Sequence, residues 1–299
     1  MSRQSPLLVA ALLMTLSALT TAVGNTLIRS LGDIGIHPFE IAFFRCAFGF
    51  LTVAPIVLWQ ERRWPRTTTV KTIAASGLCH YVSMLAFFTG VTLMPLNESA
   101  ALGFATPLFA TIGAALFLGE TVRVRRWIAI VVGFAGVLIV LRPGAVPVSL
   151  GAALVILSTM TFAGVTVLVK MMSGTERTAT VVFYQSLIVM LLTLPLALWH
   201  WTTPSLPSFL ALAALGALST LGWLCFTRAF ALADASAILP LEFTRMPFVA
   251  ILAYVFLGEV PDKWVWIGAA VIFGSTLYIA HREHAAHRRD QTQRLTEER

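Results

Sequence analysis

Glu242 and Arg245 put two opposite charges three residues apart inside an apolar stretch, ILPLEFTRMPF at residues 238–248. If this stretch is helical, the two side chains share one face and can form an ion pair, which lowers the cost of removing each charge from water. Charges at such a depth in a bilayer usually face the interior of a helix bundle or a watery cavity. The pair therefore predicts one of two roles. Arg245 attracts a substrate carboxylate while Glu242 attracts an ammonium group or a proton, or the two form a salt bridge that only fixes helix packing.

Pro107 and Pro247 lie in the middle of two apolar segments. A proline has no N–H, so the carbonyls of Gly103 and Phe243, four residues earlier, lose their usual helical partner. Transporter sites often use carbonyls freed in this way. The prolines therefore predict substrate-binding acceptors, with a simple kink or a hinge as the alternatives.

One predicted helix carries a set of aromatic and soft side chains: His80, Tyr81, Met84 and Phe88. Trp223 lies opposite Met84 in the corresponding helix of the second half. Such side chains can hold an indole or phenyl ring by stacking and sulfur contact, or a cation by its attraction to ring faces. Ordinary core or lipid-facing packing is the alternative, and His80 is also a candidate for proton coupling.

Asn25, Tyr184 and Gln185 add polar groups within other apolar segments. The amides predict either hydrogen bonds to a ligand or hydrogen bonds between helices, which are frequent in membranes.

Arg45 lies about 10 Å from the start of its predicted helix. We expect it to extend towards the nearer membrane surface and to pair with Glu40 or Glu98. A structural role is therefore predicted for Arg45.

The composition predicts a membrane protein, since 58% of the 299 residues are hydrophobic and only 12% are charged. The net charge of +7 does not indicate nucleic-acid binding, because the basic residues gather at the ends of apolar segments. The three cysteines show no metal-ligand spacing. No sequence motif of a metalloprotease, a serine hydrolase or an ATP-binding loop is present. We therefore expect no catalytic residues, no metal and no cofactor.

Ten apolar windows are long enough to cross a bilayer as helices. They cover residues 7–31, 38–59, 70–93, 98–118, 125–141, 148–170, 178–200, 208–232, 236–257 and 263–281. Lys and Arg gather in the loops after the second, fourth and sixth windows and in the tail. This distribution predicts that both termini lie in the cytoplasm and that the chain crosses the inner (plasma) membrane several times.

The two halves of the chain repeat each other at a shift of about 139 residues. FLGE occurs at 117–120 and again at 256–259, and Trp127 and Trp266 follow at the same shift. Each repeat holds five spans, an odd number, so the second copy enters the membrane in the opposite orientation. Inverted repeats of this kind are typical of transporters that open a central site to either side.

The paired stretches SAALGFATPLFATIGAALFLGE and SAILPLEFTRMPFVAILAYVFLGE, each followed by Trp and a Gly-rich segment, resemble the drug/metabolite transporter superfamily in its EamA-type branch. The resemblance implies an all-α integral membrane fold of ten transmembrane helices, arranged as two inverted five-helix repeats around a central cavity. The fifth and tenth helices would be peripheral. We expect the first repeat at 1–144, the second at 145–283 and a basic cytoplasmic tail at 284–299.

The resemblance is nearest to YddG-type exporters of aromatic amino acids and bulky organic cations. It implies a secondary-active or facilitative transporter that exports amino acids, or related amphipathic or cationic metabolites, by alternating access. A transporter of a different metabolite or drug, a non-transporting scaffold or receptor, and an intramembrane enzyme are the alternatives. The expected partners are a small-molecule substrate, protons, the lipid bilayer and, if the chain is not a monomer, a second copy in a homodimer.

Overall fold

The protein is described by a computed structural model that covers residues 4–61, 65, 67–117, 124–143, 149–172, 175–176, 178–232 and 241–278. Nearly all of these residues are helical. The helices are α1 (Gln4–Asp33), α2 (Pro38–Glu61), α3 (Val70–Leu93), α4 (Leu96–Gly103), α5 (Thr106–Phe117), α6 (Val124–Leu141), α7 (Leu150–Met172), α8 (Thr178–Trp199), α9 (Leu206–Leu232) and α11 (Arg245–Leu257). Residues 263–278 form a further helix.

Seven helices in the described part of the chain are long and apolar enough to cross a membrane, and two shorter apolar helices cover Trp127–Leu141 and Arg245–Leu257. The chain is therefore a multi-pass helical membrane protein, as the composition predicts. Ten complete spans remain a prediction. The predicted tail at 284–299 and residues 118–120 and 236–240 of the repeated pattern lie outside the described residues.

Two of the predicted spans are broken by a turn. In the span predicted at 98–118, α4 ends at Gly103 and α5 begins at Thr106. In the span predicted at 236–257, residues 243–244 form a turn directly before α11. Each turn lies just before a proline, Pro107 or Pro247, which cannot donate the hydrogen bond that would continue the helix. The two breaks therefore occupy matching positions in the repeated sequence.

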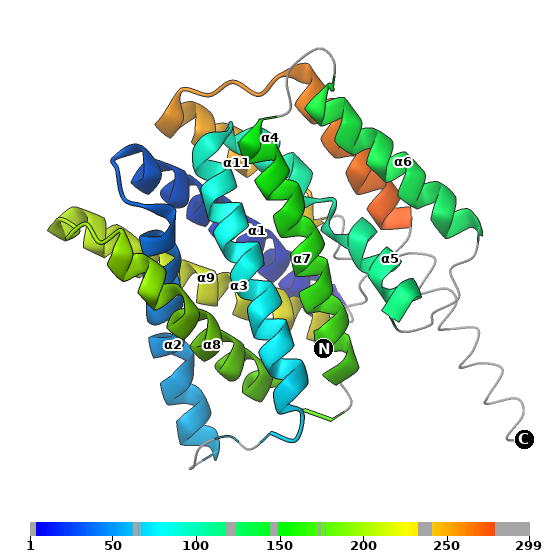
Figure 1. Cartoon of the computed structure of the whole chain (residues 1–299). Helices are drawn as coiled ribbons and strands as arrows, with labels where there is room; N and C mark the ends of the chain where they lie inside the picture. The colour runs from blue at the N-terminus through cyan, green and yellow to red at the C-terminus, as the bar shows by residue number, and fades with distance from the viewer. Residues whose placement is uncertain are drawn as a thin grey trace, which may run out of the picture.

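Helices from the first half of the chain pack against helices from the second. The most extensive helix contacts join α3 to α7, α1 to α9 and α2 to α8. Figure 1 shows α3 and α7 side by side along the front of the bundle. The core of the bundle therefore lies between the halves, and neither half forms a separate body.

The helix α6 and the helix of residues 263–278 lie together at one edge of the bundle (Figure 1). They touch through glycines: a Cβ added to Gly136 would lie 2.9 Å from the carbonyl oxygen of Gly268, and a Cβ added to Gly268 would lie 2.8 Å from that of Gly136. The missing side chains allow the two backbones to approach this closely.

Candidate substrate site

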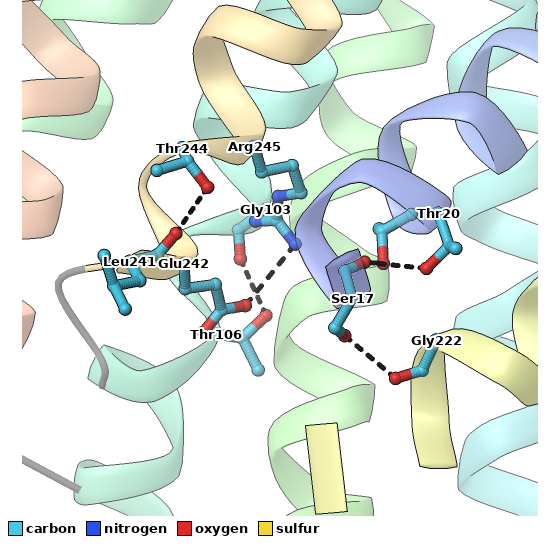
Figure 2. A network of polar contacts seen from close by, with 10 residues as sticks. Ser17, Thr20, Gly103, Thr106, Gly222, Leu241, Glu242, Thr244 and Arg245 are labelled. Atoms are coloured by element: carbon cyan, nitrogen blue, oxygen red, sulfur yellow. Dashed lines mark hydrogen bonds and ion pairs between the residues drawn. The ribbon is translucent and has the colours of Figure 1, made fainter. Parts of the chain in front are cut away.

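Arg245 and Glu242 form the ion pair that their spacing predicts. The Nη1 atom of Arg245 lies 3.6 Å from Oε1 of Glu242. Arg245 is the first residue of α11, and Glu242 precedes it across the turn at 243–244. Figure 2 shows the guanidinium and the carboxylate directed towards each other beside the break between α4 and α5. The two broken helices thus bring a charged pair to the place where their backbones are interrupted.

A cluster of aromatic rings lies beside Arg245. The Cζ atom of Arg245 lies 4.3 Å from the centroid of the Phe104 ring, close enough for a cation–π interaction. Phe104, Phe243 and Phe273 form a mutual cluster, with centroids 4.5 to 5.8 Å apart. The Nε atom of Arg245 is buried and has no hydrogen-bond partner within the described chain. The site therefore combines a paired charge, an apolar ring surface and an unused donor.

The carbonyls expected to be free at the two prolines have partners. The carbonyl oxygen of Gly103 accepts a hydrogen bond from the Thr106 hydroxyl at 3.0 Å. That of Phe243 accepts one from the N–H of Met246, also at 3.0 Å. Pro107 and Pro247 are both exposed. The expectation of two unpaired acceptors is therefore wrong, because the local turns bring other donors to them.

A hydroxyl-bearing face of α1 lies next to the ion pair, since α1 packs against both α9 and α11. The Ser17 hydroxyl donates to the carbonyl of Gly222 on α9 at 2.9 Å, and the Thr20 hydroxyl donates to the carbonyl of Ser17 at 2.9 Å (Figure 2). A Cβ on Gly222 would lie 2.5 Å from the Thr20 hydroxyl oxygen. The sequence offers one signal for these hydroxyls, since Thr15, Ser17, Thr20 and Thr21 cluster in an otherwise apolar segment.

The predicted aromatic and sulfur residues of α3 form a stripe that meets Arg45. His80, Met84 and Phe88 follow one another at intervals of four residues and therefore share one face of α3. Met84 and Phe88 are buried, whereas His80 and Tyr81 are partly buried. Arg45 of α2 contacts the stripe at Met84 and Phe88.

Within the described chain, no contact joins the remaining predicted site residues to one another in a single cluster. Asn25 is buried on α1. The Gln185 amide donates to the Ser76 hydroxyl and so joins α8 to α3. The Tyr184 hydroxyl donates to the carbonyl of Pro65. Trp223 is 48% exposed and stacks on Phe226. Their roles in substrate binding remain predictions.

Two glutamates hold the opposite ends of the bundle. Glu40, at the start of α2, accepts hydrogen bonds from the N–H and hydroxyl of Thr202, before α9. Near the other end of α2, Glu176 accepts five hydrogen bonds through Oε1, from the hydroxyls and two N–H groups of residues 67–69, before α3. These bonds, above all the one from the Thr67 hydroxyl, lower the pKa of Glu176 to about 2. Each half of the chain thus supplies a carboxylate that holds a helix start in the other half.

The family is identified by two separate matches within the chain. Residues 8–142 and residues 149–280 each match the model of the EamA-like transporter family. The chain belongs to this family. Membership makes it a transporter of the drug/metabolite superfamily and not an enzyme, as the sequence predicts.

EamA-family relatives of this chain carry different substrate names. The S-adenosylmethionine uptake transporter of Rickettsia prowazekii is 30% identical over 268 residues, 90% of this chain and 91% of the relative. The riboflavin transporter of Rhizobium johnstonii is 28% identical over 92% of both chains. A pseudopaline exporter of Pseudomonas aeruginosa is 28% identical over 87% of this chain and 92% of the relative. The family therefore fixes the class of activity and leaves the substrate open.

A similar fold also appears in a solved structure. A crystal structure of a protein with 18% sequence identity superposes with a TM-score of 0.61 over 94% of this chain and 99% of the other.

In the described part of the chain, no group of three or more His, Cys, Asp or Glu residues is placed to hold a metal ion.

Proposed function

We propose that this EamA-family transporter moves a small amphipathic metabolite that carries an amino acid group and an aromatic or otherwise apolar part. The observation that carries the proposal is the Glu242 and Arg245 pair, which lies among Phe104, Phe243 and Phe273. The Glu242 carboxylate complements the ammonium group of an amino acid, and Arg245 keeps Glu242 ionised and in place. The rings complement its apolar part.

The relatives support this substrate class in part. S-adenosylmethionine contains an amino acid group and an adenine ring, whereas riboflavin contributes a large aromatic ring system. Aromatic amino acids, the substrates expected from the sequence, belong to the same class and stay our first candidates. Since the relatives include proteins named for uptake and for export, the export direction expected from the sequence stays a proposal.

We further propose that the two halves, residues 1–144 and 145–283, are inverted copies that rock around the site. Three observations support this. The helix pairs that make the most extensive contacts are α1 with α9, α2 with α8 and α3 with α7. The first helix of each half thus packs against the third helix of the other half, and the two second helices pack against each other. The helix breaks before Pro107 and Pro247 correspond. The hydrogen bonds of Glu40 to Thr202 and of Glu176 to residues 67–69, which we call the two glutamate clamps, each join one half to the other, at opposite ends of α2.

In this mechanism the two glutamate clamps close the two ends of the transporter in turn. Opening one end breaks the bonds of Glu40 to Thr202, and opening the other breaks the bonds of Glu176 to residues 67–69. Glu242 is the candidate for proton coupling, since protonation would release Arg245 from its partner. We place both termini in the cytoplasm and the chain in the inner membrane.

Counterflow in proteoliposomes tests the proposal. The purified full chain is reconstituted and preloaded with unlabelled compound, and entry of labelled tryptophan, phenylalanine, S-adenosylmethionine, riboflavin and an organic dication is followed with and without a pH gradient. We expect the amino acid compounds to exchange faster than in protein-free vesicles. We also expect Arg245→Ala to abolish the exchange. Arg142→Gln is the matched control. Arg142 lies away from this site and pairs with Asp262 at a distance of 2.7 Å.

Two results would contradict the proposal. If riboflavin or the dication exchanges and no amino acid compound does, the substrate class is wrong. If Arg245→Ala exchanges at the wild-type rate, the ion pair is only a packing element.

A further inference from the structure

Arg45 is a second arginine inside the helical bundle, and its surroundings differ from what the sequence predicts. Its Nε atom donates to the Ser219 hydroxyl of α9 at 3.0 Å, and its Nη1 lies 3.3 Å from the sulfur of Met84 on α3. Its Cζ lies 5.8 Å from the centroid of the Phe88 ring. Helices α2, α3 and α9 therefore hold the guanidinium in one orientation through neutral groups.

The charge of Arg45 has no counter-charge within the described residues. Neither of its expected partners pairs with it. Glu40 accepts its hydrogen bonds from Thr202 instead, and no ion pair joins Glu98 to Arg45 within the described chain. Three other arginines of the described chain are paired: Arg29 with Asp33, Arg142 with Asp262 and Arg245 with Glu242. Arg228 on α9 has no ion pair there either, but it is exposed.

An unpaired arginine inside a membrane protein is costly, and such charges usually mark the path of a substrate or an ion. Arg45 is partly buried, so its guanidinium is not sealed within the core. One turn along α3 from Met84, the Nδ1 atom of His80 is buried and has no hydrogen-bond partner in the described chain. The region thus holds a positive charge and an unused polar atom, and none of the described acidic residues forms an ion pair with Arg45.

The donors of Arg45 suit a carboxylate. A guanidinium has five N–H groups in a planar fork, of which Ser219 engages one and the Met84 sulfur is only a weak acceptor for another. The remaining donors can bind both oxygens of a carboxylate. Met84 and Phe88 provide a soft, apolar wall beside that position for the rest of the molecule.

We propose that Arg45 binds the carboxylate of the transported molecule and that Ser219 and Met84 orient it for this purpose. The inference rests on the proposed function, because it assigns one group of the proposed substrate class to one residue. It makes Arg45 a determinant of specificity for carboxylate-bearing substrates over the corresponding amines.

Matched pairs of compounds test this assignment. The dissociation constants of tryptophan and tryptamine, and of S-adenosylmethionine and its decarboxylated form, are measured by calorimetry on the purified full chain in detergent. We expect the wild type to bind the carboxylate member of at least one pair at least tenfold more tightly than its amine. In Arg45→Gln this preference falls to about one, because a neutral amide has no charge to offer a carboxylate. Arg45→Lys keeps part of the preference, since lysine retains the charge without the fork.

Arg29→Gln is the matched control. Arg29 is paired with Asp33 and also donates to the carbonyls of Val91 and Thr92, so its loss removes a cation without removing the proposed carboxylate site. We expect it to retain the wild-type preference. Ser219→Ala frees Nε of Arg45 and keeps the charge, so its preference should fall between those of the wild type and Arg45→Gln.

The outcomes separate this inference from the proposed function. If the wild type binds no member of either pair, the proposed substrate class fails, and the assignment of Arg45 fails with it. If the wild type prefers the carboxylates and Arg45→Gln keeps that preference, only the assignment is overturned. If Arg45→Gln does not give a monodisperse protein, an unchanged preference in both Arg45→Lys and Ser219→Ala overturns the assignment.

Discussion

Arg45 and Arg245 lie in the same bundle, and the structure treats their charges differently. Arg245 has a carboxylate 3.6 Å away and an aromatic ring 4.3 Å away. Arg45 is held by a hydroxyl and a thioether, with a ring at 5.8 Å. The first arrangement balances its own charge, whereas the second has a net positive charge that another molecule can balance.

The difference shows why depth in the membrane does not by itself identify a binding residue. A buried ion pair contributes little net stability, yet the loss of one partner is strongly destabilising because the other charge stays buried and unpaired. Substitution of an arginine that has no ion-pair partner leaves no opposite charge buried and unpaired within the protein. Stability measurements should therefore separate the two residues, and the preference for carboxylate-bearing compounds should separate them in the opposite sense.

The largest effect is expected for Glu242→Gln. It leaves Arg245 without its counter-charge, and we expect the free energy of unfolding to fall by about 2 kcal/mol, less than for a fully enclosed pair because the Glu242 side chain is 32% exposed. Unfolding in mixed SDS micelles, followed by tryptophan fluorescence, measures the change. The double variant Glu242→Gln/Arg245→Gln should recover part of the loss, and a double variant less stable than the sum of the single changes would contradict an ion pair.

Smaller and unequal effects on stability are expected for substitution of the two arginines themselves. Arg245→Gln leaves Glu242 unpaired and should cost about 1 to 2 kcal/mol, whereas Arg45→Gln should change stability by less than about 0.5 kcal/mol. The same unfolding assay applies to both. Equal losses in the two variants would mean that Arg45 is a packing element after all.

The aromatic contacts give a finer comparison. Phe104→Leu keeps an apolar side chain and removes the ring face under Arg245, at an expected cost of about 1 kcal/mol. Phe88→Leu should cost less through its arginine, because that ring lies further from its guanidinium. To isolate the arginine contribution, each change is repeated in the matching arginine-to-glutamine background. If Phe104→Leu costs the same with and without Arg245, the ring does not stabilise the charge.

The smallest pH dependence near neutral pH is expected of Glu176, which serves as a reference carboxylate outside the spans. Its pKa is lowered from 4.5 to about 2, so its clamp contributes stability above pH 4.5 and loses that contribution as the pH falls towards 2. The melting temperature of the wild type should therefore drop across this range, and the drop should be smaller in Glu176→Gln. Between pH 5 and 7 the two proteins should respond alike, so any pH dependence of transport in that range arises from other groups.

The helical membrane character of the chain can be predicted from sequence, because the length of an apolar segment is a local signal. The ion pair of Glu242 and Arg245 is confirmed for the same reason, since an i, i+3 spacing lies within a single segment. The positions of both helix breaks were not predicted, although Pro107 and Pro247 indicated a disturbance. The turn geometry that gives the Gly103 and Phe243 carbonyls other partners depends on the backbone path and not on composition.

The role of Arg45 was not predicted, because it depends on contacts between distant segments. Glu40 seemed available on the same helix, but Thr202, 162 residues away, holds its carboxylate. One local signal was present: no acidic residue lies three or four positions from Arg45 in its span. That absence favours a charge without a partner on its own helix, and only the assembled bundle shows which neighbours take the partner's place.

The contact between Gly136 and Gly268 has a consequence for genetic studies of this transporter. Any side chain at either position would collide with the opposite backbone, whereas a Cβ at Gly274, on the same helix as Gly268, meets nothing within 4 Å. In a library of single substitutions, Gly136 and Gly268 would therefore tolerate as few changes as a residue that contacts substrate. Gly274 would tolerate many. Intolerance to substitution alone would therefore also identify this contact between two outer helices, which has no role in substrate binding. Only a measurement that depends on the ligand would separate such packing positions from those that determine substrate specificity.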